Sequence, residues 1–123
     1  PIPIACEIVQ ALQTMITRRI SGLDPAVVTV GKIVAGTVNN IIPETAQIEG
    51  TIRAVSERTR REVHDGIRRV AEGIAAAHGA EVDVVLEDGY PVTVNDTTQA
   101  ALGNTSPHSA KGLFVVTTVL LCW

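Results

Sequence analysis

The sequence predicts an α+β fold, a two-layer sandwich in which two helices cover one face of an antiparallel sheet. Two segments carry apolar residues at the three-to-four-residue spacing of a helix with one buried face. The segments that follow them are short and rich in valine and isoleucine, and one alternates strictly between apolar and polar residues. With 123 residues the chain is long enough for one domain with its own core.

The first helix is predicted over residues 4–20, and Gly22 and Pro25 end it. A strand follows over residues 27–35. Lys32 interrupts its valine-rich pattern, as is typical of an edge strand that carries a charge against uncontrolled pairing. The apolar positions of the helix are Ile4, Ala5, Ile8, Val9, Leu12, Met15 and Ile16.

The next strand is predicted over residues 46–55, with one packed and one solvated face. Ser56 is expected to be the N-cap of a second helix. Gly79 is expected to be the glycine that follows the end of this helix. A third strand is predicted over residues 81–86. The packed face of the alternating strand consists of Ala46, Ile48, Gly50, Ile52 and Ala54. The apolar stripe of the second helix consists of Val63, Ile67, Val70, Ile74 and Ala77.

The last part of the chain divides into a polar segment, residues 97–111, and an apolar tail. Residues 113–121 of the tail are apolar on both faces, as in a strand buried inside a sheet. The order resembles a ferredoxin-like two-layer sandwich whose first strand is missing, and that strand lies centrally in the sheet. We expect residues 113–121 to replace it, either within the chain or swapped between two chains. The alternative is an apolar extension that packs loosely or promotes aggregation.

Composition and motifs exclude several classes of function. A net charge of -3 and an aromatic content of 2% disfavour nucleic acid as a partner. No apolar run reaches the roughly 18 residues that span a bilayer, and the start of the sequence has no signal-peptide pattern. A cytoplasmic protein without a membrane partner is therefore expected.

The sequence contains no catalytic or metal-binding pattern. The three histidines, His64, His78 and His108, lack the spacing that places two ligands on adjacent helical turns. Two cysteines make no disulfide framework, and Cys6 is expected to be buried on the first helix. No metal site and no catalytic residue are predicted for this chain.

Five segments together resemble the lid, or dimerisation, domain of the zinc-dependent aminoacylase, hippurate hydrolase and carboxypeptidase G family of metallopeptidases. The most specific is Gly-Thr-Val-Asn-Asn-Ile-Ile-Pro at residues 36–43, followed by Glu-Gly-Thr-Ile-Arg at residues 49–53. Residues 3–19, 28–33 and 89–96 resemble the entry helix, the next strand and the segment after the last strand. The resemblance implies a lid/dimerisation domain over residues 1–96 and a non-family tail over residues 97–123.

The resemblance also implies what surrounds such a domain. The zinc of the family belongs to a separate catalytic domain, whose metal-binding motifs are not found in this sequence. The resemblance implies that Asn40 and Arg53 help to hold the carboxylate or carbonyl of an N-acyl amino acid in the parent enzyme. Arginine suits a carboxylate because its guanidinium donates two parallel hydrogen bonds, and an asparagine amide can donate to an oxyanion.

We therefore expect a self-associating domain of an N-acyl amino acid amidohydrolase that is not catalytic by itself. A homodimer is expected, through the edge strand 27–35 or through a swapped tail, with Val28, Val30 and Lys32 at the interface. Two alternatives remain open. The chain could retain metal-dependent amide hydrolysis, or it could bind the carboxylates of N-acyl amino acids.

Overall fold

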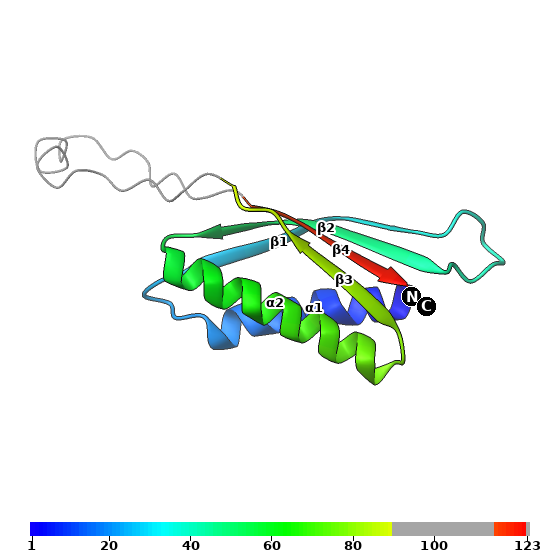
Figure 1. Ribbon diagram of the computed structural model, residues 1–123, viewed down its shortest axis with the longest axis horizontal. Helices are drawn as coiled ribbons and strands as arrows, with labels where there is room; N and C mark the ends of the chain where they lie inside the picture. The colour runs from blue at the N-terminus through cyan, green and yellow to red at the C-terminus, as the bar shows by residue number, and fades with distance from the viewer. Residues whose placement is uncertain (90–114, 123) are drawn as a thin grey trace, which may run out of the picture.

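The computed structural model describes residues 1–89 and 115–122. Two helices lie on one face of an antiparallel sheet, which confirms the α+β class and the ferredoxin-like arrangement (Figure 1). Every predicted helix and strand is present, with ends that move by one or two residues. The elements in chain order are α1 (Ile2–Arg19), β1 (Ala26–Ala35), β2 (Thr45–Ala54), α2 (Glu57–Ala77), β3 (Glu81–Leu86) and β4 (Val115–Cys122).

The tail strand β4 fills the central position of the sheet, whose order is β1-β2-β4-β3. It runs antiparallel to both neighbours, and Cys122 lies opposite Thr45 on β2 and Glu81 on β3. The position that a ferredoxin-like first strand would occupy is thus taken by a strand of the same chain. The predicted residues 113 and 114 lie outside the described part of the chain.

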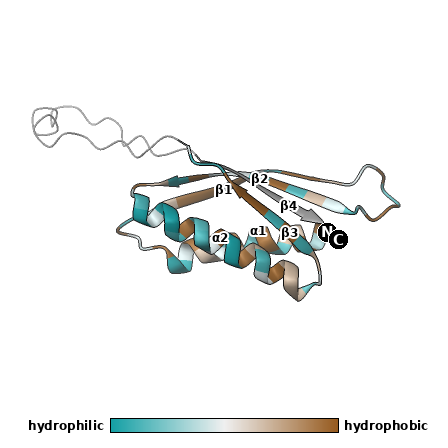
Figure 2. Ribbon diagram, in the orientation of Figure 1, coloured by the Kyte–Doolittle hydropathy of each residue, from teal (hydrophilic) through white to brown (hydrophobic). Residues whose placement is uncertain are grey.

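The core lies between the sheet and the helices. The alternation predicted for β2 is present, with Ile48 and Ile52 buried and Gln47 on the opposite, partly solvated face. Figure 2 shows hydrophilic residues on the outward turns of α2 and hydrophobic residues along β1. The buried hydrophobic residues are Ile4, Ala5, Ile8, Leu12, Met15, Ala26, Val28, Ala46, Ile48, Ile52, Ala54, Val63, Ile67, Ala71 and Ala75.

A polar cluster ties the start of α2 to the turn before β1. Ser56 caps the helix as predicted, because its Oγ accepts a hydrogen bond from the backbone N–H of Thr59 at 3.1 Å. The hydroxyls of Ser56 and of the buried Thr59 both donate to the carboxylate of Asp24. These two hydrogen bonds stabilise the charged carboxylate and so hold the pKa of Asp24 below its ordinary value. The bond from Ser56 has the larger effect and that from Thr59 the smaller.

Two details of the predicted burial are wrong. Cys6 is exposed, because the buried face of α1 passes through Ala5 and Ile8 and leaves Cys6 turned outward. On α2, Ala77 is exposed, while Ala71 and Ala75 are buried. Val63 and Ile67 are buried as predicted, and the predicted Val70 and Ile74 are half-buried and pack against the core. The proposed boundary between residues 96 and 97 lies outside the described residues.

Candidate functional site

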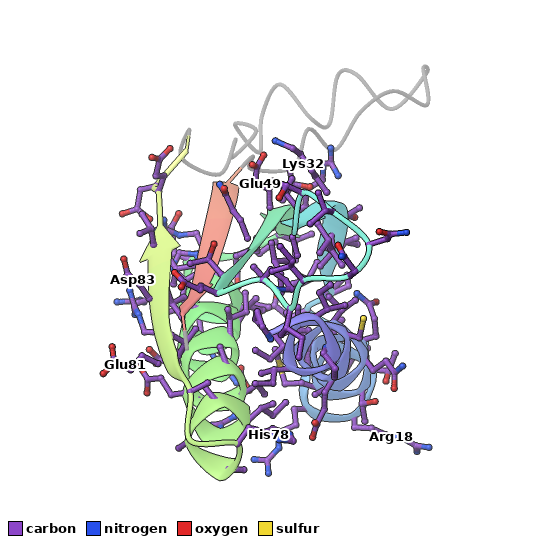
Figure 3. The ribbon with its side chains drawn as sticks, turned by 90° about the vertical axis from the view of Figure 1, so that its right-hand side faces the viewer. Arg18, Lys32, Glu49, His78, Glu81 and Asp83 are labelled. Atoms are coloured by element: carbon purple, nitrogen blue, oxygen red, sulfur yellow. The ribbon has the colours of Figure 1, made fainter. Side chains whose placement is uncertain are left out.

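The two edges of the sheet differ in length and in chemistry. β1 forms one edge and has ten residues, whereas β3 forms the other and has six. On β1 the valines Val27 and Val34 are 52% and 48% exposed. On β3 the acidic residues Glu81 and Asp83 project away from the sheet (Figure 3). β1 also carries a charge, Lys32, but this charge is paired with Glu49 on β2, so β1 is the longer and less acidic edge and the better suited to pairing with another strand.

The three predicted interface residues occupy different positions on β1. Val28 is buried at 8% exposure and faces the helices, and Val30 is half-buried. Lys32 is exposed, and its Nζ lies 2.8 Å from Oε1 of Glu49 on β2, on the outer face of the sheet (Figure 3). Val28 can therefore contribute its backbone to an edge contact, whereas its side chain belongs to the core.

A β-bulge divides β1 between Val30 and Lys32, where the register with β2 shifts by one residue. Gly50 of β2 lies opposite Val30. A Cβ atom at Gly50 would lie 2.5 Å from the carbonyl oxygen of Thr29, closer than any real contact. The backbones of β1 and β2 therefore approach each other more closely at Gly50 than a side chain would permit.

The loop between β1 and β2 lines an open cavity beside the first residues of α1. Gly36 begins the loop in the left-handed region, with φ of 76°, which glycine adopts without steric cost. The cavity measures about 420 Å³. It is mainly apolar, and Asn40 is among its polar groups. The lining residues are Pro1, Ile2, Pro3, Asn39, Asn40, Ile41, Ile42 and Pro43.

Arg53 does not lie near Asn40. It lies opposite Val27, at the end of β2 that is remote from the loop. Thr45 and Arg53 are eight positions apart on β2, which corresponds to about 26 Å along an extended strand. One chain therefore cannot hold one small carboxylate with both side chains.

His64 is the described histidine whose environment is most perturbed. Its Nε2 atom is buried and has no hydrogen-bond partner among residues 1–89. Burial lowers the pKa of His64 from its ordinary value of 6.5, since desolvation penalises the charged imidazolium. The positive charges of Arg60 and Arg68 lower it further, while Asp88 and Asp65 act in the opposite direction. The folded chain thus favours neutral His64.

We expect the free energy of unfolding to fall as the pH drops below about 6.5, because of His64. The unfolded chain takes up the proton first, so it is stabilised relative to the folded chain until the lowered folded-state pKa is passed. Well above pH 6.5 His64 is neutral in both states and no longer makes the free energy of unfolding depend on pH. Urea unfolding of the wild type and His64→Gln across this range measures the effect. Equal slopes for the two proteins would contradict it.

In the described part of the chain, no group of three His, Cys, Asp or Glu residues is arranged to hold a metal ion. His78 instead lies at the end of α2, with its Nε2 atom 2.7 Å from the Glu7 carboxylate on α1. His108 lies outside the described residues. None of the described helices is long and apolar enough to cross a membrane.

Comparison of the sequence with known proteins identifies relatives of this chain. The family model of the peptidase dimerisation domain, M20_dimer, matches residues 1–79. The chain is 42% identical to N-acetylcysteine deacetylase of Bacillus subtilis over 98 residues, which cover 80% of the chain and 26% of that protein. It is 39% identical to N-acetyldiaminopimelate deacetylase of Lactiplantibacillus plantarum over 95 residues, 76% of the chain and 25% of that protein.

A third relative is thermostable carboxypeptidase 2 of Saccharolobus solfataricus, which is 38% identical over 97 residues. These residues cover 78% of the chain and 25% of that protein. The chain thus spans about a quarter of the length of these three curated relatives. No solved structure matches the chain significantly.

Proposed function

The chain belongs to the peptidase dimerisation domain family, and we propose that it joins two copies of a larger hydrolase by pairing their β1 edges. The observation that carries this proposal is the edge itself. β1 has ten residues, pairs with β2 on one side, and forms the edge of the sheet on the other. Its exposed Val27 and Val34 add apolar area, which favours association because contact removes that area from water.

Pairing of two β1 strands would join two four-stranded sheets into one continuous sheet. The contact would be isologous, with the same strand contributed by each copy, as in most homodimers. Main-chain hydrogen bonds would supply affinity in the manner of strand addition. α1 would take part as well, because it packs beneath β1 and lies on the same side of the molecule as that edge (Figure 3).

For the whole protein we propose metal-dependent hydrolysis of an N-acyl amino acid or a related amide. The names of the two deacetylases and the carboxypeptidase support this proposal. The zinc would be held outside this chain. Asn40 remains a proposed substrate-binding residue because it lines the loop cavity. Since Arg53 lies far from that cavity, its proposed contact with substrate would need a different ligand position or a second chain.

The edge contact predicts that Val27→Lys raises the dissociation constant of the dimer at least roughly tenfold, because a charge would replace exposed apolar area on the pairing edge of each copy. Val27 is suitable because its side chain is exposed and lies on the outer face, so the fold should be retained. A charge at the buried Val28 would disturb the core instead. Sedimentation equilibrium over a range of concentrations measures the dissociation constant.

Val85→Lys is the matched control. Val85 is 44% exposed and lies on the opposite edge of the same sheet, opposite Thr118. We expect this variant to dimerise as the wild type does. Dissociation by Val85→Lys with an intact Val27→Lys dimer would move the interface to β3 and refute the proposal. A wild-type chain that stays monomeric at all concentrations would refute it as well.

A further inference from the structure

One hydrogen bond joins the surface of α1 to the edge strand. The side-chain amide of Gln13 donates through Nε2 to the backbone carbonyl of Val28, at a distance of 3.3 Å. Gln13 is exposed on α1. The contact therefore lies at the margin of the molecule, where the helix layer meets the edge of the sheet.

The carbonyl of Val28 points away from β2. The evidence is the position of Thr29, whose carbonyl oxygen would lie 2.5 Å from a Cβ atom at Gly50 and therefore points toward β2. Successive carbonyls of a strand point in opposite directions, so the carbonyl of Val28 points to the free edge. The N–H of Val28 points to the same side, because both groups of one residue share a direction in an antiparallel ladder.

An added strand would need this outward carbonyl as an acceptor. Each outward N–H and C=O of an edge strand is a position at which another strand can bind. In the described chain the carbonyl of Val28 already accepts from Gln13. A carbonyl has two lone pairs, but donors that share one acceptor weaken each other, so a second β1 strand that pairs at Val28 competes with the Gln13 side chain.

We propose that Gln13 is a placeholder on the β1 edge, which occupies the carbonyl of Val28 in the free chain and competes for it with the incoming strand when two β1 strands pair. Gln13 thereby sets the strength of self-association. This inference rests on the proposed pairing of β1 edges. It adds a residue of α1 that opposes pairing.

The geometry of the hydrogen bond suits a contact that is made and released. A donor–acceptor distance of 3.3 Å is longer than the usual range for N–H···O, so the bond is weak. The side chain of Gln13 is exposed and can exchange the carbonyl for water when a strand arrives. In the free chain the bond satisfies the Val28 carbonyl, which could otherwise accept a hydrogen bond from any extended chain that reached the edge.

The test is Gln13→Met, which keeps the length and the helix propensity of the side chain but removes the donor. Two placeholder bonds are lost per dimer, so the dissociation constant is expected to fall roughly 10- to 30-fold, since each bond contributes a modest net free energy. Gln10→Met is the matched control. Gln10 is exposed on the same helix, and its side chain makes no hydrogen bond to the described residues. It should leave the dissociation constant unchanged.

Sedimentation equilibrium of the wild type, Gln13→Met and Gln10→Met gives the comparison. A Gln13→Met dimer that is as strong as the wild type, or weaker, overturns the placeholder role.

The Val27→Lys result separates the two proposals. If Val27→Lys dissociates the dimer and Gln13→Met fails to strengthen it, the placeholder role is wrong and the β1 interface stands. If Val27→Lys leaves the dimer intact, the β1 interface is wrong and the placeholder role falls with it. A tighter Gln13→Met dimer together with a dissociated Val27→Lys dimer supports both.

Discussion

Removal of residues 112–123 is expected to abolish cooperative unfolding of the chain. β4 lies between β2 and β3 and pairs with both along most of its length. Within the described residues, β3 pairs with no other strand. Loss of β4 would therefore leave β3 without a partner and would expose a second edge on β2.

Thermal and urea unfolding, followed by circular dichroism, measure this effect. The truncated chain should show a broad transition or none, because the two helices and the β1–β2 pair that remain bury too little surface. Val119→Pro is the single-residue counterpart, since proline inside a central strand removes a ladder hydrogen bond. A chain that lacks only Trp123, which follows β4, is the control and should unfold as the full chain does. An unchanged transition in the truncated chain would show that β4 is dispensable.

Gly50→Ala is expected to destabilise the fold by about 2–3 kcal/mol, toward the upper end of the usual cost of overpacking. The added methyl group would meet the carbonyl oxygen of Thr29 at 2.5 Å. A backbone oxygen cannot rotate away as the end of a side chain can, so β1 or β2 must shift. Ile48 and Ile52, on either side of Gly50, are buried and resist such a shift.

Gly73→Ala is the control for the general effect of replacing glycine by alanine. Gly73 lies in α2, and a Cβ atom there meets nothing within 4 Å. The free energy of unfolding of this variant should rise by up to about 1 kcal/mol, because alanine favours the helix. Urea unfolding measures the change in the free energy of unfolding for each variant. Changes of opposite sign would confirm that the close approach of the two backbones, and not the loss of a glycine as such, determines the effect at Gly50. A destabilisation below 0.5 kcal/mol for Gly50→Ala would contradict the argument, since surface substitutions have effects of about that size.

Most of the fold could be predicted because its signals are local. Ser56 begins α2 and Gly79, with φ of 67°, follows it, and each is a residue type with a specific role at a helix end. β2 could be predicted because apolar and polar residues alternate along it with a period of two. The central position of β4 followed from its two-sided apolar pattern and from the vacancy that the element order implied.

The features that could not be predicted depend on contacts between segments that are distant in sequence. Gln13 is one of several polar residues on the solvated side of α1, and no pattern distinguishes it from Gln10. Its role emerges from the direction of one carbonyl on β1. The bulge had a visible signal, since Gly31 interrupts the apolar pattern where the register shifts. The partial burial of His64 had no such signal, because charged residues lie on both sides of it in the sequence.

The central placement of β4 has a consequence for the connectivity of the chain. The last residue of β4, Cys122, pairs with Thr45, and the loop that ends at Pro43 lines a cavity together with Pro1. The start of α1 and the end of β4 thus lie at the same end of the molecule (Figure 1). A short peptide from Cys122 to Pro1, with new termini between Leu86 and Val115, would give the strand-first order of the ferredoxin-like fold. Read from β4 through α1 to β3, the described elements thus follow the ferredoxin-like order, so the arrangement of the layers does not depend on which strand comes first in the sequence.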